Sequence, residues 1–197
     1  MKAKRALDIV LAAPALCIAA PFMLAIGVCV RLTSPGPAIH RAVRSGQHGT
    51  PFTLYKFRSM RVATGDGETA RITAAGDSRI TGIGRLLRAT KLDELPQLVN
   101  VLRGDMSIVG PRPEDPSYVS EYTDAQREIL KWRPGLTSPA SIEYRHEEDL
   151  LSAATDLDAA YATIMDAKIQ LDVAYFSSSS ARSDLKVIFR TVRSLFV

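Results

Sequence analysis

Two adjacent acids stand in the part of this 197-residue chain that is richest in chemically capable side chains, the segment 91–113. Asp93 and Glu94 precede an apolar run with helical spacing, which places them in or just before the first turn of a helix. Free N–H groups and the positive end of the helix dipole favour negative charge there, whether carboxylate or phosphate. Thr90 and Asp93 are both acceptable helix caps, so the first helical residue stays open.

The two acids are expected to play different roles. Successive residues of a helix point about 100° apart, so Asp93 and Glu94 cannot face one atom equally. An acid pair that only complements the helix terminus is the plainer interpretation. Basic residues on both sides favour a bound phosphate, although a solvated charged surface has the same composition. These residues are Arg79, Arg85, Arg88, Lys91, Arg103 and Arg112.

A second basic pair lies on a predicted strand. The segment 45–49 is typical of a hairpin loop, and residues 52–57 alternate in the manner of a short strand. Lys56 and Arg58 share one face of that strand and are candidates for holding a diphosphate, with solvent-exposed strand charges as the alternative. A helix predicted for 79–90 adds two arginines one turn apart, near the acids.

Several motifs, in one order, resemble those of the bacterial sugar transferase family, the small monotopic phosphoglycosyl transferases. They are Tyr55–Met60 (YKFRSM), Lys91–Leu98 (KLDELPQL), Asn100–Ser107 (NVLRGDMS) and Val109–Pro113 (VGPRP). Order and spacing match from about Lys4 to the C-terminus. The resemblance therefore covers nearly the whole chain.

This resemblance implies an enzyme that moves a sugar-1-phosphate from a UDP-sugar to polyprenol (undecaprenyl) phosphate and releases UMP. It also implies a place at the cytoplasmic face of the bacterial inner membrane, at the first membrane step of surface polysaccharide or glycoprotein glycan synthesis. The expected partners are therefore the UDP-sugar, the polyprenol phosphate and membrane lipid. A homodimer is left open.

The mechanistic hypothesis is a two-step displacement in which Asp93 attacks the sugar-linked phosphorus and forms an aspartyl-phosphosugar. Because two negative reactants repel, Mg²⁺ is the expected cofactor, with Asp93 or Glu94 as its protein ligands. Pro111 is expected to help shape the nucleotide pocket. The candidates for binding phosphate are Lys56, Arg58, Arg85, Arg88 and Arg112.

Two alternatives keep part of this interpretation. The lipid phosphate could attack directly in a ternary complex, with Asp93 only a metal ligand. The chain could instead be a catalytically idle membrane adaptor that binds nucleotide sugars, which the intact Asp93 and Glu94 disfavour.

One segment departs from the family pattern. After Arg133–Thr137, family members commonly continue with Gly-Trp-Ala-Gln and a later Gly-Arg, whereas this chain has Ser138–Ser141 (SPAS). Arg145 corresponds to the later arginine and is a further substrate-binding candidate. Since the Trp and Gln are absent, the sugar preference of relatives does not transfer to this chain.

The N-terminal region predicts a membrane anchor. Ile9–Val30 has no charged residue and would form about 33 Å of helix, enough to cross a ~30 Å hydrocarbon core. However, Pro14 and Pro21 each remove a helical hydrogen bond and favour a bend. Both flanks are also basic, which draws both ends to the cytoplasmic face. We therefore expect a re-entrant helix-break-helix hairpin over residues 1–32 and a cytosolic catalytic domain over 33–197.

Details of this anchor follow from neighbouring residues. The family resemblance implies a Ser-Pro break, for which this chain has Ala20-Pro21, so a serine hydroxyl is missing at the bend. A cleaved signal peptide, with 13–15 as a small-residue site, is the alternative. Arg5 and Asp8 stand three residues apart, which allows a helical ion pair with an anchoring role.

The remaining patterns predict an α+β, mostly helical fold. Residues 62–78 are rich in glycine and predict a loop, while 118–132 and 158–175 predict helices. Ser183 or Asp184 could cap a last helix, whose apolar stripe and basic flank are typical of a helix at the membrane interface. A core-packing helix is the alternative. The stripe comprises Leu185, Ile188, Phe189, Val192, Leu195 and Phe196.

Charge is distributed unevenly along the chain, although the net charge is only +4. The segment 31–61 has six basic residues and no acid, whereas 143–158 has six acids and one arginine. This asymmetry suits anionic lipid or an anionic ligand, and nucleic acid is not expected because no stacking-aromatic or recognition-helix pattern accompanies it. Cys17 and Cys29 indicate neither a disulfide framework nor a zinc site.

Overall fold

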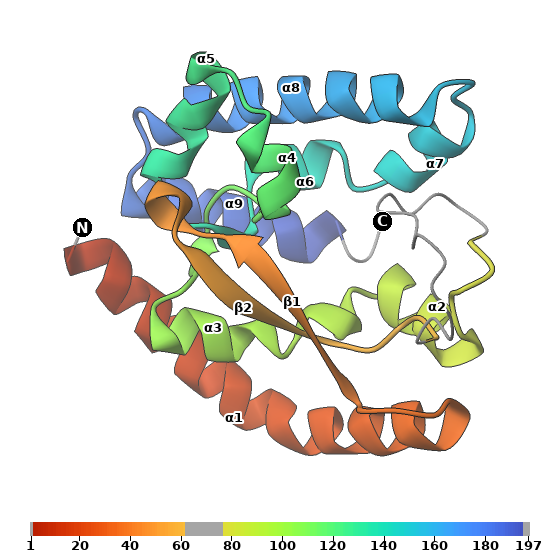
Figure 1. Cartoon of the computed structure of the whole chain (residues 1–197). Helices are drawn as coiled ribbons and strands as arrows, with labels where there is room; N and C mark the ends of the chain where they lie inside the picture. Colours follow the sequence, from red (N-terminus) through yellow and green to blue (C-terminus); the bar gives the residue numbers. More distant parts are fainter. Residues whose placement is uncertain (1, 62–76, 195–197) are drawn as a thin grey trace.

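The computed structural model describes residues 2–61 and 77–194, so most of the predicted loop at 62–78 lies outside the described residues. The fold is α+β and mostly helical, as predicted. Helix α1 (Lys2–Thr33) runs along one side of the molecule and α8 (Leu157–Phe176) along the opposite side. The antiparallel hairpin of β1 (Ile39–Ser45) and β2 (Pro51–Phe57) crosses the space between them (Figure 1).

Helix α1 is long and apolar, with Pro14 and Pro21 inside it. Figure 1 shows one helix that bends part-way along, so the predicted gap in helical structure at Ala20-Pro21 is absent. A proline removes one hydrogen bond and can bend a helix without ending it. By length and composition, the span Ala3–Thr33 could cross a membrane: the mean hydropathy of its most apolar 18-residue window is 2.4, and 6% of that window is buried.

Both halves of α1 pack against the rest of the protein. Ala12 belongs to a core cluster with Val101 and Met106, whereas Val30 packs with Phe57 and Leu87. The other side of the helix exposes large apolar side chains. These are Ile9, Val10, Ile18, Phe22, Leu24, Val28 and Leu32.

The structure contains two pairs of short strands among the described residues. The β1–β2 hairpin was predicted, and its register pairs Ile39 with Phe57 and Ser45 with Pro51. A second pair, β3 (Ser107–Val109) parallel to β4 (Gly135–Thr137), was missed because three residues are too few to show an alternating pattern. A Cβ on Gly135 would lie 2.1 Å from the Gly110 nitrogen, so these backbones can approach only without side chains.

The acidic pair lies in a turn between two helices. Helix α2 (Gly82–Ala89) starts at Thr81, whose side chain accepts a hydrogen bond from the Gly84 amide. The chain then reverses at Lys91, which has a left-handed backbone (φ 56°), and enters the 3₁₀ turn η2 (Leu92–Glu94). Helix α3 (Gln97–Arg103) begins after Pro96 without a side-chain cap. Both predicted caps, Thr90 and Asp93, are therefore wrong.

The single helix predicted for 118–132 is also wrong. The structure divides it into α4 (Pro116–Ser120), α5 (Asp124–Arg127) and the 3₁₀ turn η3 (Glu128–Lys131). Thr123 and Gln126 form a reciprocal capping box, which starts a new helix inside the predicted one.

The C-terminal region follows the prediction more closely. Two short helices, α6 (Pro139–Glu143) and α7 (Glu147–Ser152), precede α8, which was predicted. The last helix, α9 (Ala181–Ser194), begins before the predicted caps Ser183 and Asp184.

Hydrogen bonds explain where α9 begins and how it packs. Ser180 and Ser183 exchange hydrogen bonds across the first turn, which sets the start of the helix. Asp184 is buried and accepts hydrogen bonds from Lys4 and Tyr175, so it links α9 to α1. The helix packs Val187 into the core and exposes Leu185, Phe189 and Val192.

Candidate active site

Asp93 is buried, with 5% of its surface exposed. Its Oδ1 atom is buried and has no hydrogen-bond partner within the described part of the chain. Burial and the neighbouring Glu94 raise the pKa of Asp93, against the opposing charges of Lys56, Arg88 and Lys91. A buried carboxylate oxygen without a partner costs free energy unless a ligand pairs with it. This oxygen is therefore available to a ligand.

Glu94 has a different environment although it is adjacent in sequence. Its Oε1 atom accepts a hydrogen bond from Nη2 of Arg112 at 2.9 Å. Burial alone would raise the pKa of Glu94, but the charge and hydrogen bond of Arg112 outweigh it and hold that pKa below its ordinary value. The same contact raises the pKa of Arg112. The ion pair keeps Glu94 ionised and held in place, whereas Asp93 retains a free oxygen.

Lys56 and Arg88 complete the basic surroundings of Asp93. Lys56 comes from β2, and burial together with the charge of Arg112 lowers its pKa, while Asp93 acts in the opposite direction. Arg88 comes from α2 and forms an ion pair with Glu148 of α7. Its Nε atom is buried and has no partner among residues 2–61 and 77–194. Together with Arg112, which binds Glu94, cations from three separate segments thus act on the carboxylate pair.

Three of the predicted substrate-binding arginines form no hydrogen bond or ion pair with the acidic pair in the described structure. Arg58 is buried and donates to the carbonyl oxygens of Val30 and Ser34, where it caps the C-terminus of α1. Arg145 donates to the Ser194 carbonyl at 2.8 Å, at the end of α9. Arg85 is exposed, and no hydrogen bond or ion pair is recorded for it within the described ranges. The helix-capping contacts could not be predicted, because the capped carbonyls are distant in sequence. Nε and Nη1 of Arg58 are buried and have no partner in the described structure, so substrate binding by Arg58 stays a prediction.

The predicted ion pair between Arg5 and Asp8 is wrong, but both side chains anchor α1 to the protein. Arg5 donates from Nη1 to the Val101 carbonyl at 2.5 Å and from Nη2 to the Leu102 carbonyl at 2.7 Å, at the end of α3. Asp8 accepts hydrogen bonds from the Ser107 hydroxyl and the Ile108 amide. Side chains three residues apart on a helix can contact each other. Arg5 and Asp8 instead form hydrogen bonds with α3 and β3.

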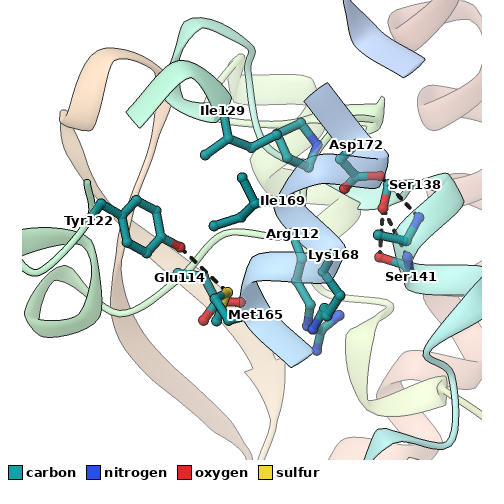
Figure 2. A pocket seen from close by; sticks show the side chains of 12 residues that line it. Arg112, Glu114, Tyr122, Ile129, Ser138, Ser141, Met165, Lys168, Ile169 and Asp172 are labelled. Carbon is teal, nitrogen blue, oxygen red and sulfur yellow. Dashed lines mark hydrogen bonds between the residues drawn. The ribbon is translucent and has the colours of Figure 1, made fainter. Parts of the chain in front are cut away.

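Arg112 also borders a small cavity beside α8. Figure 2 shows Arg112 and Lys168 pointing toward the same end of this cavity, and Asp172 near Ser138 at another side. Its volume of about 30 Å³ is room for ordered water, not for a nucleotide sugar. Pro111 is buried on its wall. Sequence reasoning missed Lys168 and Asp172 because each is one polar residue in an ordinary helical pattern.

The carboxylates of Asp93 and Glu94 could supply only some of the ligands that a magnesium ion needs. Within the part of the chain that the structure describes, no group of three or more His, Cys, Asp or Glu side chains could hold a metal. Mg²⁺ in phosphate-transfer sites commonly takes one or two carboxylates and completes its coordination with substrate phosphates and water. The free oxygen of Asp93 matches that arrangement.

The geometry defines a class of site: a buried carboxylate with a free oxygen, surrounded by cations, next to an apolar membrane-type helix. Comparison with known proteins agrees, because the model of the family "Bacterial sugar transferase" matches residues 1–197. The chain belongs to this family, as the sequence motifs predicted.

Curated relatives align with almost the whole chain. A UDP-glucose:undecaprenyl-phosphate glucose-1-phosphate transferase of Caulobacter vibrioides is 40% identical over 98% of the chain and 69% of the relative. A protein of the same name from Escherichia coli is 39% identical over 98% of the chain and 40% of its own length. The UDP-N-acetylgalactosamine-undecaprenyl-phosphate N-acetylgalactosaminephosphotransferase of Aeromonas hydrophila is 35% identical, with 98% and 43% covered. The chain thus spans less than half of these last two relatives.

Proposed function

We propose that this chain is a phosphoglycosyl transferase that moves a sugar-1-phosphate from a UDP-sugar to polyprenol (undecaprenyl) phosphate and releases UMP. The observation that carries the proposal is the buried Asp93 carboxylate, which has one oxygen without a partner in the described structure and is acted on by the charges of Lys56, Arg88 and Lys91. The names of the relatives support the substrate classes, since they pair UDP-sugars with undecaprenyl phosphate.

In the proposed mechanism, an Asp93 oxygen attacks the phosphorus that carries the sugar. A bond forms between Asp93 and phosphorus, and the bond to the bridging oxygen breaks, so UMP leaves with that oxygen and its electron pair. An oxygen of the lipid phosphate then attacks the same phosphorus. The bond to Asp93 breaks, which regenerates the carboxylate and yields the lipid-linked diphosphosugar.

The surrounding residues prepare Asp93 for this chemistry. Burial raises its pKa, which makes the carboxylate a better nucleophile than an exposed one, while Lys56, Arg88 and Lys91 favour its ionised form. Arg112 holds Glu94 in a fixed place and can offer its remaining donors to a phosphate. When bound by Asp93 or Glu94, Mg²⁺ would neutralise charge on the diphosphate.

The anchoring of α1 supports a re-entrant arrangement at the cytoplasmic face of the inner membrane. At its N-terminal end Lys4, Arg5 and Asp8 bind the catalytic part of the chain, and at its C-terminal end Arg58 binds Ser34. Both ends of the helix therefore lie against the same folded unit, and the bend carries exposed apolar residues between them. A helix crossing the bilayer would separate its two ends by ~30 Å of hydrocarbon.

Helix α9 is the proposed second membrane contact. It exposes Leu185, Phe189 and Val192 beside basic residues and touches α1 through Asp184 and Lys4. An apolar face with a basic flank suits a helix lying in the interface of an anionic membrane. Such a surface would hold the acidic pair near lipid headgroups, where a polyprenol phosphate presents its charged end.

The direct test is UMP release from a panel of UDP-sugars by the full chain in undecaprenyl-phosphate liposomes. We expect UMP release with at least one sugar, dependent on Mg²⁺ and on the lipid for repeated turnover. Absence of UMP with every sugar, despite binding of UDP-sugar, would favour the idle adaptor.

Initial rates separate the two enzymatic mechanisms. With both substrates varied, the two-step displacement predicts parallel lines in double-reciprocal plots. Intersecting lines would favour direct attack within a ternary complex. Activity measured against protein density in the liposomes would test the homodimer, which we also propose as a hypothesis.

A further inference from the structure

Helix α7 begins with two acids that bind cations from two different parts of the molecule. Glu148 pairs with Arg88 of α2, sixty residues earlier in the chain. Glu147 pairs with Lys168 of α8 at 2.6 Å and also acts electrostatically on Arg112. Both acids belong to the acid-rich segment 143–158, to which the proposed function assigns no role.

We propose that Glu148 is a positioning residue, which fixes the Arg88 guanidinium in the orientation needed to bind the transferring phosphate. This inference rests on the proposed function. Arg88 acts electrostatically on Asp93, so its placement matters at the reacting carboxylate.

The contacts of Arg88 indicate how the positioning works. A guanidinium is a rigid planar fork with five N–H donors, so fixing one edge also fixes the direction of the others. Glu148 accepts a hydrogen bond from Nη2 of Arg88, while Nε of Arg88 is buried and has no partner among the described residues. The buried Nε thus remains available for an anion, and Glu148 determines where it points.

Glu147 supports the same arrangement from the other side. Lys168 is buried in α8 and its ammonium group is held by Glu147. This contact fixes the first turn of α7 against α8, so that the neighbouring Glu148 can reach Arg88. Two adjacent ion pairs therefore connect the α8 side of the protein with the α2 side of the site.

The pair is suited to a clean test because it should contribute little to folding. The Glu148 side chain is 41% exposed and the Arg88 side chain 19% exposed. Ion pairs with such access to solvent stabilise proteins only weakly, so Glu148→Gln should fold normally. Glu143→Gln is the matched control: it removes the same charge from the same segment, and Glu143 is exposed with no recorded polar contact in the described structure.

The experiment measures UMP release from UDP-glucose and UDP-N-acetylgalactosamine by the full chain in undecaprenyl-phosphate liposomes. Glu148→Gln should lower kcat about tenfold and change the KM for the UDP-sugar less than threefold, because orientation matters most in the transition state. Glu143→Gln should match the parent. A fall in KM without a loss of kcat would overturn the proposal, since Glu148 would then only compete with the substrate.

A double substitution shows whether Glu148 acts through Arg88. In an Arg88→Gln background, the further change Glu148→Gln should alter kcat less than twofold. A second full tenfold loss would mean that Glu148 acts independently, which contradicts the proposal.

A substrate-free measurement keeps this inference separate from the proposed function. The Nε–H resonance of Arg88, identified by its loss in Arg88→Lys, should exchange slowly with water in the parent. It should exchange at least tenfold faster in Glu148→Gln and remain unchanged in Glu143→Gln. An unchanged resonance in Glu148→Gln refutes the positioning role even if the parent turns over neither sugar, and activity of the parent alone decides the proposed function.

Discussion

Asp93 and Asp172 are both buried aspartates, with 5% and 3% of their surfaces exposed, and burial raises the pKa of each. Their contacts differ. Asp172 of α8 accepts a hydrogen bond from the Ala140 amide at 3.0 Å, and neither of its oxygens is a buried atom without a partner in the described structure. Asp93 in η2 has a buried oxygen with no partner in the described structure. A satisfied buried carboxylate holds segments together, whereas an unsatisfied one near several cations is available to a ligand.

The comparison predicts its largest effect on turnover. Asp93→Asn should lower UMP release at least ~10³-fold, because an amide is a poor nucleophile, while Asp172→Asn should stay within about threefold of the parent. Both variants should retain the parent's helical circular dichroism. Substantial turnover by Asp93→Asn would mean that the nucleophile is assigned wrongly.

Two arginines on α2 give a second comparison, with an intermediate expected effect on kcat/KM. Arg88→Gln should lower kcat/KM about 10- to 100-fold, since it removes a cation that faces Asp93. Arg85→Gln should change it less than twofold, because Arg85 is exposed on the same helix. Steady-state UMP release measures both. Equal losses would show that α2 acts through its overall charge and not through one placed guanidinium.

Asp8 in α1 is, like Asp172, a buried carboxylate that accepts hydrogen bonds from other segments. Asp8→Ala should lower the free energy of unfolding by about 2 kcal/mol, since the Ser107 hydroxyl and Ile108 amide would lose their partner. Asp158→Ala, at an exposed position, is the control and should change stability by less than ~0.5 kcal/mol. Thermal unfolding in matched detergent compares the two. Equal stability of both variants would show that the Asp8 contacts do not hold α1.

The raised pKa of Asp172 predicts a dependence of stability on pH and little change in turnover. Its pKa is raised to about 6 in the folded protein, against roughly 3.9 when unfolded. Between these values the folded state binds more protons, so this group makes stability fall as pH rises from 4 to 6 and then level off. The change is up to about 3 kcal/mol. Asp172→Asn should remove it from melting curves recorded across this range, and an unchanged pH profile would refute the shift.

Local patterns predicted the regular elements and the candidate acids. Alternation identified the β1–β2 hairpin, helical spacing identified α8, and the motif resemblance pointed to Asp93 and Glu94. The prediction of a single helix at 118–132 was wrong because a capping box at Thr123 starts a new helix there. The left-handed turn at Lys91 carries no sequence signal, since left-handed residues are usually glycine.

The contacts of individual charged residues could not be predicted from local sequence. Arg58 and Arg145 are predicted phosphate ligands, and nothing in the local sequence shows that each also donates to carbonyls at the end of a helix, 24 to 28 residues away for Arg58 and 49 for Arg145. Conversely, Glu147 and Glu148 belong to no motif, and only the packing of α7 brings them to Lys168 and Arg88. Long-range packing, which spacing does not encode, decides which cation faces the acids.

The central claim is tested most directly by trapping the sugar-phosphate on the protein. The full chain would be incubated with the radiolabelled form of the UDP-sugar that it turns over, without polyprenol phosphate, and then digested and analysed by mass spectrometry. The account predicts a sugar-phosphate adduct on the peptide that contains Asp93, its transfer to undecaprenyl phosphate once the lipid is added, and no adduct in Asp93→Asn. Full turnover with lipid but no adduct in its absence, or an adduct on another residue, would contradict it.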